Sequence, residues 1–236
     1  MTNPPAILDR QRLKLKLIRR SLRLQLGQAV LIFLPAGTLN FWQGWACFAL
    51  NAGLQLGLII YFYHRDPQVL ERRLLTREKN SGQKVIIVLL RLVIASTLVL
   101  SGLDHRFGWT SAILFPMPVW LTAVALLCMA GGQWLFFQIL QANRFAASII
   151  QVETGQTIAA TGPYRFIRHP MYVAMIIHWL AAPLALGSLV GLGAGVLVVP
   201  VFVLRLLDEE RILRRDLPGY VHYCRKTPCR LVPYIW

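Results

Sequence analysis

Residues 85–103 read VIIVLLRLVIASTLVLSGL, and Arg91 is the single charged residue among these 19. About 20 mainly apolar residues are enough for a helix to cross the hydrocarbon core of a bilayer. Five other stretches have the same character, although 24–39 and 171–186 are short and each contains a proline. The sequence therefore predicts an all-α polytopic membrane protein with six transmembrane helices, at 24–39, 45–63, 85–103, 119–140, 171–186 and 189–207.

The composition of the 236 residues supports this class: 56% are hydrophobic, 15% are charged, and the mean hydropathy is +0.53. Soluble domains carry about 25% charged residues, so a disordered, collagen-like or disulfide-stapled chain is excluded. The net charge is +15. Because the basic residues alternate with apolar runs, we expect the lipid bilayer as partner and no nucleic acid. The four cysteines form no disulfide framework or zinc-ligand set, and we expect no metal site.

The positions of the basic residues predict the topology. Of 25 lysines and arginines, 23 precede the first span, follow the second or fourth, or lie at or after the end of the sixth. Under the positive-inside rule, both termini are cytoplasmic and Arg106 lies on the far side of the cell inner (plasma) membrane. Residues 8–26 place leucines among basic residues, which is typical of an interfacial helix, with a cleaved signal peptide as the alternative. We divide the chain into an interfacial helix at 1–23, four spans at 24–140 and a catalytic region at 141–236.

The first segment that carries candidate functional residues joins the fourth and fifth spans. Gly162 and Pro163 are a turn signal. Pro170 keeps His169 out of a helical conformation and suits the first turn of the next helix. Arg168 and His169 are then expected at a helix N-terminus, where an anion binds readily. The alternative is an arginine–histidine pair that only contacts lipid headgroups.

The second segment leaves the sixth span. It begins with Arg205 and continues with the acidic run from Asp208 to Glu210. Arg205 and Glu209 are four residues apart and share one helical face. Acidic residues at the mouth of a span are costly unless they are paired or functional. The alternative is a set of salt bridges on a solvated helix extension.

Together these segments form a pattern that neither shows alone. It comprises Gly162-Pro163-Tyr164, Arg168-His169-Pro170-x-Tyr172, Arg205-x3-Glu209-Glu210 and Tyr220-x2-Tyr223. With it the chain resembles the isoprenylcysteine carboxyl methyltransferase family, and within it the bacterial membrane members. Phospholipid N-methyltransferases look similar over the same histidine–proline and paired-glutamate features. The resemblance is close over residues 141–236 and looser before them.

The resemblance implies S-adenosylmethionine as methyl donor and a hydrophobic small-molecule or lipid acceptor that enters from the bilayer. It implies that Tyr164, His169, Pro170 and Tyr172 line the cofactor, that Glu209 or Glu210 contacts its ammonium or ribose, and that Asn143 falls where the family has an asparagine. From the residues themselves we add Arg168 and Glu210 to the expected cofactor-binding residues and expect Arg205 and Glu209 to be catalytic. Where the prenylcysteine enzymes usually carry a histidine before the glycine–tyrosine turn, this chain has Gln156.

The chemistry of methyl transfer fits these residue types. A carboxylate acceptor needs alignment by a cation such as Arg205 and no base, whereas an amine must lose a proton, which Glu209 or Glu210 could accept. Glu210 lies about 100° around the helix from Glu209. Our hypothesis is that Glu209 holds Arg205, which orients the acceptor, while Glu210 meets the cofactor. We favour carboxylate O-methylation over phospholipid amine N-methylation.

Two other classes stay open from the sequence. Membrane sterol reductases have a similar C-terminal architecture and use a nicotinamide cofactor. A membrane scaffold would use the same charged segments for helix assembly. A soluble Rossmann-type methyltransferase is excluded, because no G-x-G-x-x-G follows a predicted strand.

Overall fold

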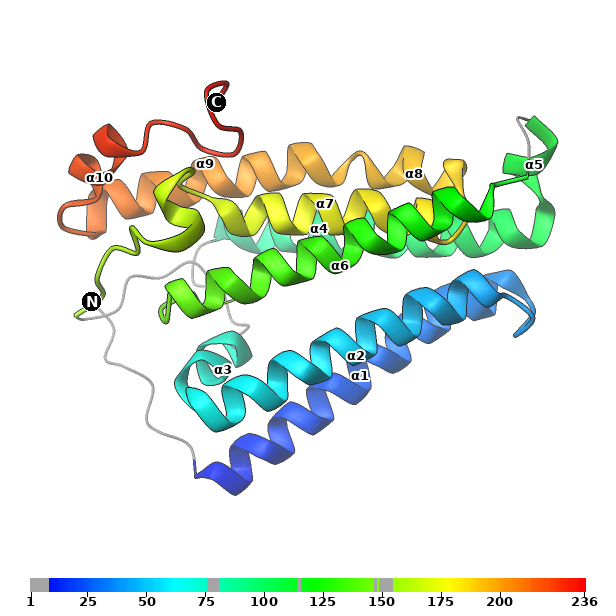
Figure 1. The fold of residues 1–236 in the computed structure, drawn as a ribbon, viewed down its shortest axis with the longest axis horizontal. Helices are drawn as coiled ribbons and strands as arrows, with labels where there is room; N and C mark the ends of the chain where they lie inside the picture. Colours follow the sequence, from blue (N-terminus) through cyan, green and yellow to red (C-terminus); the bar gives the residue numbers. More distant parts are fainter. Residues whose placement is uncertain (1–8, 76–80, 114–115, 147, 149–154) are drawn as a thin grey trace.

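The computed structural model describes residues 9–75, 81–113, 116–146, 148 and 155–236, and in these residues it contains helices and no strands (Figure 1). The elements in chain order are α1 (Arg10–Ala36), α2 (Trp42–Arg65), α3 (Pro67–Leu74), α4 (Ser81–Phe107), α5 (Trp109–Ile113), α6 (Val119–Ala142), the 3₁₀ helix η1 (Gly162–Arg165), α7 (Pro170–Ala185), α8 (Leu189–Gly195), α9 (Val198–Asp216) and α10 (Tyr220–Lys226). The predicted all-α class is confirmed.

The long helices form a bundle in which α6 and α7 make the most extensive contact. The α1–α2 hairpin packs on this bundle, with α1 against α4 and α2 against α6. The start of α1, the end of α2 with α3, and the end of α9 with α10 all lie at one end of the molecule, and α5 lies at the other (Figure 1). The basic segments therefore gather at one end, while the side of the membrane that this end faces stays a prediction.

Small residues let the helices approach closely, as is common in membrane bundles. A Cβ atom on Gly102 of α4 would lie 2.5 Å from the carbonyl oxygen of Ile32 in α1. A Cβ atom on Gly132 of α6 would lie 2.8 Å from the carbonyl oxygen of Ala174 in α7. Both distances are too short for a real contact, so these two packings require glycine.

Within the described residues, four helices are long and apolar enough to cross a membrane: Trp42–Arg65, Gly82–Phe107, Val119–Ala142 and the combined α8–α9 stretch Leu189–Asp216. Their outer faces carry large exposed side chains such as Leu127 and Trp134, which suits contact with lipid. The predicted fifth span corresponds to the shorter apolar helix α7. The six-span count and the cytoplasmic C-terminal segment therefore stay predictions beyond these four helices.

The predicted interfacial segment and the predicted first span are one helix, α1. The side chain of Asp9 accepts a hydrogen bond from the backbone N–H of Gln11 at its start, and Gly37 ends it in a left-handed conformation. The proposed boundary at residue 23 lies inside this helix. Its basic first half is the reason why α1 is not among the helices apolar enough to span.

Candidate functional site

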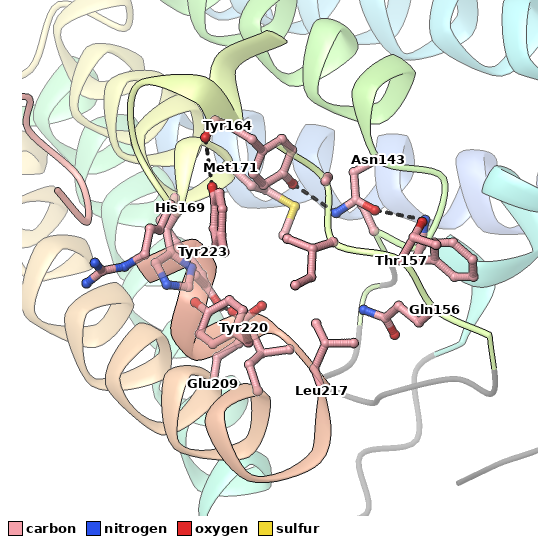
Figure 2. Close-up of a pocket in the computed structure, with 17 residues that line it drawn as sticks. Asn143, Gln156, Thr157, Tyr164, His169, Met171, Glu209, Leu217, Tyr220 and Tyr223 are labelled. Atoms are coloured by element: carbon pink, nitrogen blue, oxygen red, sulfur yellow. Dashed lines mark hydrogen bonds between the residues drawn. The ribbon is translucent and has the colours of Figure 1, made fainter. Parts of the chain in front are cut away.

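A pocket lies at the basic end of the bundle, between the end of α6, η1, the start of α7, the end of α9 and α10. In Figure 2, Tyr220 and Tyr223 of α10 lie on one side of it, and Asn143 and Gln156 lie on the other. Six of the nine predicted site residues line the pocket: Asn143, Tyr164, Arg168, His169, Tyr172 and Glu209. Segments that are far apart in the sequence thus meet here, as the motif pattern predicted.

The chain reaches the pocket through a tight turn followed by a helix start. Gly162 adopts a positive φ of 57°, and Pro163 occupies the beginning of η1. His169 caps α7 and Pro170 is its first residue, where the missing N–H of proline costs nothing. The backbone N–H groups of Arg168 and His169 donate to the carbonyl oxygens of Cys229 and Arg230. The C-terminal tail therefore packs against the start of α7.

Beside the pocket, Glu210 holds three basic side chains from other segments, and we name Arg168, His169, Glu210 and Arg230 the clamp. A fourth basic side chain, Arg214 of the same helix, lies 3.8 Å from Oε2 of Glu210. Oε1 of Glu210 lies 2.7 Å from Nε of Arg168 and 3.3 Å from Nε2 of His169, and Oε2 accepts from Nε of Arg230 at 3.1 Å. Nη1 of Arg168 also donates to the carbonyl oxygens of Thr227 and Pro228. The carboxylate of Glu210 is 4% exposed, so the clamp is a buried ion-pair network that ties α7, α9 and the tail together.

The clamp revises the predicted anion site at the start of α7. Arg168 and His169 do lie at that helix start, but both are buried, and the anion they meet is Glu210 of the same chain. Glu210 itself does not line the pocket, and neither does Pro170, which borders a neighbouring groove. The hypothesis that Glu210 meets a cofactor therefore has no geometric support in the described residues.

Glu209 points into the pocket and is linked to the interior of the bundle by Tyr172. The hydroxyl of Tyr172 donates to Oε2 of Glu209, and it also hydrogen-bonds the side chain of Arg205. Nη2 of Arg205 donates to the carbonyl oxygen of Ser148 at 3.0 Å. Arg205 is buried behind the pocket and does not line it. Both predicted catalytic residues thus contact one tyrosine hydroxyl.

Hydrogen bonds hold Asn143, Tyr164 and Tyr223 in place around the pocket. Nδ2 of Asn143 donates to the hydroxyl of Tyr164, and Oδ1 accepts from the backbone N–H of Phe145 (Figure 2). The hydroxyl of Tyr223 donates to the carbonyl oxygen of Tyr164 at 2.7 Å. Burial raises the pKa of Tyr164 and raises that of Tyr223 to about 12. These hydroxyls are therefore neutral hydrogen-bonding groups at physiological pH.

Tyr220 is the most informative lining residue that was not predicted as a site residue. Its hydroxyl oxygen is buried and has no hydrogen-bond partner within the described part of the chain. Burial, followed by the charge of Glu210, raises its pKa, so it stays protonated. Buried polar groups without partners are rare, and such a group is typical of a site where water or a ligand binds. The spacing Tyr220-x2-Tyr223 was the signal that could have found it.

Comparison with known proteins shows that part of the chain is similar to a known family. Residues 120–217 match the family model described as phospholipid methyltransferase. Residues 120–217 are therefore similar to a membrane methyltransferase domain. The match includes all nine predicted site residues but less than half of the chain, and it leaves out α1–α5 and α10. We found no match among curated proteins.

The matched family supports the resemblance seen in the sequence at the level of the superfamily. Phospholipid methyltransferases belong to the same superfamily as the isoprenylcysteine carboxyl methyltransferases. The specific family, the methyl donor and the acceptor are not distinguished by this match.

Proposed function

We propose that the protein uses S-adenosylmethionine to methylate a lipid or prenyl-type acceptor, with a carboxylate oxygen as the favoured target. The observation that carries the proposal is that one pocket holds both the Glu209 carboxylate and the Tyr220 hydroxyl, which has no hydrogen-bond partner among the described residues. One group suits a cation and the other suits a hydroxyl or carboxylate. S-Adenosylmethionine carries groups of both kinds.

The pocket offers donors and acceptors that fit this cofactor. Glu209 would balance its positive charge, Tyr220 would hydrogen-bond a polar group, and Tyr164 and Met171 would pack against its apolar surface. The pocket volume is about 90 Å³, below the range of about 300–1,000 Å³ that is common for small-molecule sites. The proposal therefore requires part of the wall to move outward when the cofactor binds.

When bound, S-adenosylmethionine supplies a methyl group on a positively charged sulfur. In its transfer to a carboxylate, a C–O bond forms and the C–S bond breaks, with the electron pair left on sulfur and no proton released. The chain therefore needs alignment and charge placement more than a base. Arg205 would orient the acceptor, and Tyr172 would fix Arg205 relative to Glu209.

Two observations bear on the choice between carboxylate and amine. Arg73 lies close enough to Arg205 for the two positive charges to influence each other, and two neighbouring cations favour a negatively charged carboxylate as the group that binds beside them. The amine acceptor is the second candidate, because the matched family is described as phospholipid methyltransferase and Glu209 could accept the proton.

Binding measurements would test the cofactor. Titration of detergent-purified protein with S-adenosylmethionine should give saturable binding that Glu209→Gln weakens and Asp216→Asn leaves unchanged. Asp216 is a matched control, because it is an acid of the same helix whose carboxylate pairs with the neighbouring Arg215 outside the pocket. Binding of NADPH in place of S-adenosylmethionine would overturn the proposal in favour of a reductase.

A second measurement would identify the acceptor atom. Purified protein, methyl-labelled donor and a total lipid extract should yield a labelled lipid. Mild alkali should release the label as methanol if the product is a methyl ester, whereas an N-methyl group is stable to alkali. Alkali-stable label would favour the amine candidate.

A further inference from the structure

A second cavity, of about 700 Å³, lies between the α1–α2 hairpin and helices α4, α6 and α7. Most of its wall comes from apolar side chains such as Leu31, Leu58 and Phe136. Its volume falls within the range of about 300–1,000 Å³ that is common for small-molecule sites. Most of its lining residues belong to α1, α2, α3 and α4, which lie outside the residues matched by the methyltransferase family.

One part of this cavity is strongly basic. Arg20, Arg23, Arg73 and Arg91 line it, and no aspartate or glutamate does so among the described residues. Nη1 of Arg20 donates to the carbonyl oxygen of Arg73 at 2.8 Å, which brings α1 and α3 together here. Burial, and then the charges of Arg23 and Arg91, lower the pKa of Arg20. Mutually repelling cations beside an apolar cavity are complementary to an anion with an apolar tail.

The deeper wall carries polar groups at positions where the helices are otherwise apolar. Nε2 of Gln25 donates to Oε1 of Gln55 at 2.6 Å, which joins α1 to α2. Oε1 of Gln25 and Nδ1 of His178 are buried and have no hydrogen-bond partner within the described residues, and both side chains belong to the cavity wall. Unsatisfied polar atoms at this depth are costly. A hydroxyl group could donate to either atom.

The basic part of the cavity adjoins the pocket of the proposed function. Arg73 lines the cavity, and its Nη1 contacts Sδ of Met171, which lines the pocket. Along α7, Met171 and Tyr172 face the pocket, whereas Met175 and His178 face the cavity. A molecule in the cavity with its head at Arg73 would therefore have that head next to Glu209 and Tyr172.

We propose that this cavity selects the acceptor as an anionic single-chain amphiphile that carries a hydroxyl group along its chain. Arg20, Arg73 and Arg91 hold the acidic head, the apolar wall takes the chain, and Gln25 and His178 bind the hydroxyl. This inference rests on the proposed function, because only a methyltransferase would use the bound amphiphile as a methyl acceptor. The selectivity comes from the N-terminal helices and not from the matched methyltransferase domain.

Binding of three C18 probes to the detergent-purified full chain would test the proposal: 12-hydroxyoctadecanoate, octadecanoate and octadecylamine. We expect the carboxylates to bind at least about tenfold more tightly than the amine, and the hydroxylated acid to bind several-fold more tightly than octadecanoate. Equal affinity for amine and carboxylate would overturn the proposal. Equal affinity for the two acids would overturn the assignment of Gln25 and His178.

Variants locate the binding site. Arg91→Gln should weaken binding of octadecanoate by about tenfold, and Arg91→Lys should retain most of it because the charge is kept. Arg12→Gln is the matched control, because Arg12 is an exposed arginine of α1 that does not line the cavity. Unchanged octadecanoate affinity in Arg91→Gln would place the anion elsewhere and overturn the proposal. A melting temperature close to wild type checks that each variant is folded.

The proposed function and this inference fail separately, because neither binding measurement needs the other ligand. Saturable S-adenosylmethionine binding without selectivity for the carboxylate probes would leave the function and remove the acceptor site. Carboxylate-selective binding that depends on Arg91, without S-adenosylmethionine binding, would keep an anionic amphiphile site and remove the methyltransferase assignment.

Discussion

Glu209 and Glu210 are neighbours in α9, yet they belong to regions of opposite character. In the clamp, both carboxylate oxygens of Glu210 have basic partners, and the group is almost fully buried. In the pocket, Glu209 meets the Tyr172 hydroxyl and lies near the unpartnered hydroxyl of Tyr220. The clamp is satisfied by its own chain, whereas the pocket keeps polar groups available. We infer that the clamp fixes the tail and the pocket binds the ligand.

The largest expected effect comes from breaking the clamp with Glu210→Ala. This change leaves Arg168 buried without its carboxylate, and loss of one partner of a buried ion pair costs on the order of 3 kcal/mol. The melting temperature in detergent should fall clearly, and cofactor binding should weaken only as folded protein is lost. Asp216→Asn, an exposed acid of the same helix, should leave the melting temperature unchanged. A fully stable Glu210→Ala variant would contradict the clamp.

The opposite pattern is expected for Glu209→Gln. The side chain keeps its size and can still bond Tyr172, so the melting temperature should stay near wild type. The lost negative charge should reduce kcat/KM by about 100-fold, the scale of a lost electrostatic contact in an active site. Steady-state methyl-transfer kinetics and thermal unfolding, measured on the same variant, separate a loss of activity from a loss of stability. A loss of stability that matches Glu210→Ala would remove the distinction between the two regions.

A smaller effect is expected for Arg205→Lys, which tests the link between pocket and bundle. Lysine keeps the charge but cannot reproduce the planar fork that contacts both the Tyr172 side chain and the Ser148 carbonyl. We expect kcat to fall by about tenfold with little change in cofactor affinity, because alignment is a transition-state effect. Single-turnover kinetics at saturating cofactor would measure it. A purely KM effect would indicate a role in binding the ground state.

The smallest effect is expected for Tyr220→Phe. One hydrogen bond to the cofactor is worth about 1 kcal/mol, which is about a fivefold loss of affinity. Because the hydroxyl has no hydrogen-bond partner among the residues that the structure describes, its removal should leave the melting temperature unchanged or raise it slightly. Tyr234→Phe, at a fully exposed tyrosine, is the matched control in titration calorimetry. Destabilisation by Tyr220→Phe would show that the hydroxyl has a structural partner.

Sequence patterns identified part of the candidate site and missed the part that depends on packing between distant segments. Asn143, Tyr164, Tyr172 and Glu209, which were predicted as site residues, line one pocket. They lie at or near the ends of helices that meet at the same end of the bundle. The motifs did not separate the roles of Glu209 and Glu210, since an offset of about 100° places the two side chains in different surroundings that only packing defines. Arg73 was missed altogether. It comes from the short helix α3, and no local pattern connects α3 with α7.

Apolar length and charge placement determined the all-helical membrane class from the sequence alone, because a bilayer demands long apolar helices with internally bonded backbones. The turn at Gly162 and the start of α7 at Pro170 could also be predicted from the local sequence, because they follow from the backbone chemistry of glycine and proline. The tertiary structure alone decided that the tail returns to Arg168, that Glu210 neutralises it, and that arginines of α1, α3 and α4 meet at one cavity. These contacts join residues far apart in the chain. They depend on helix packing, which no single stretch of sequence encodes.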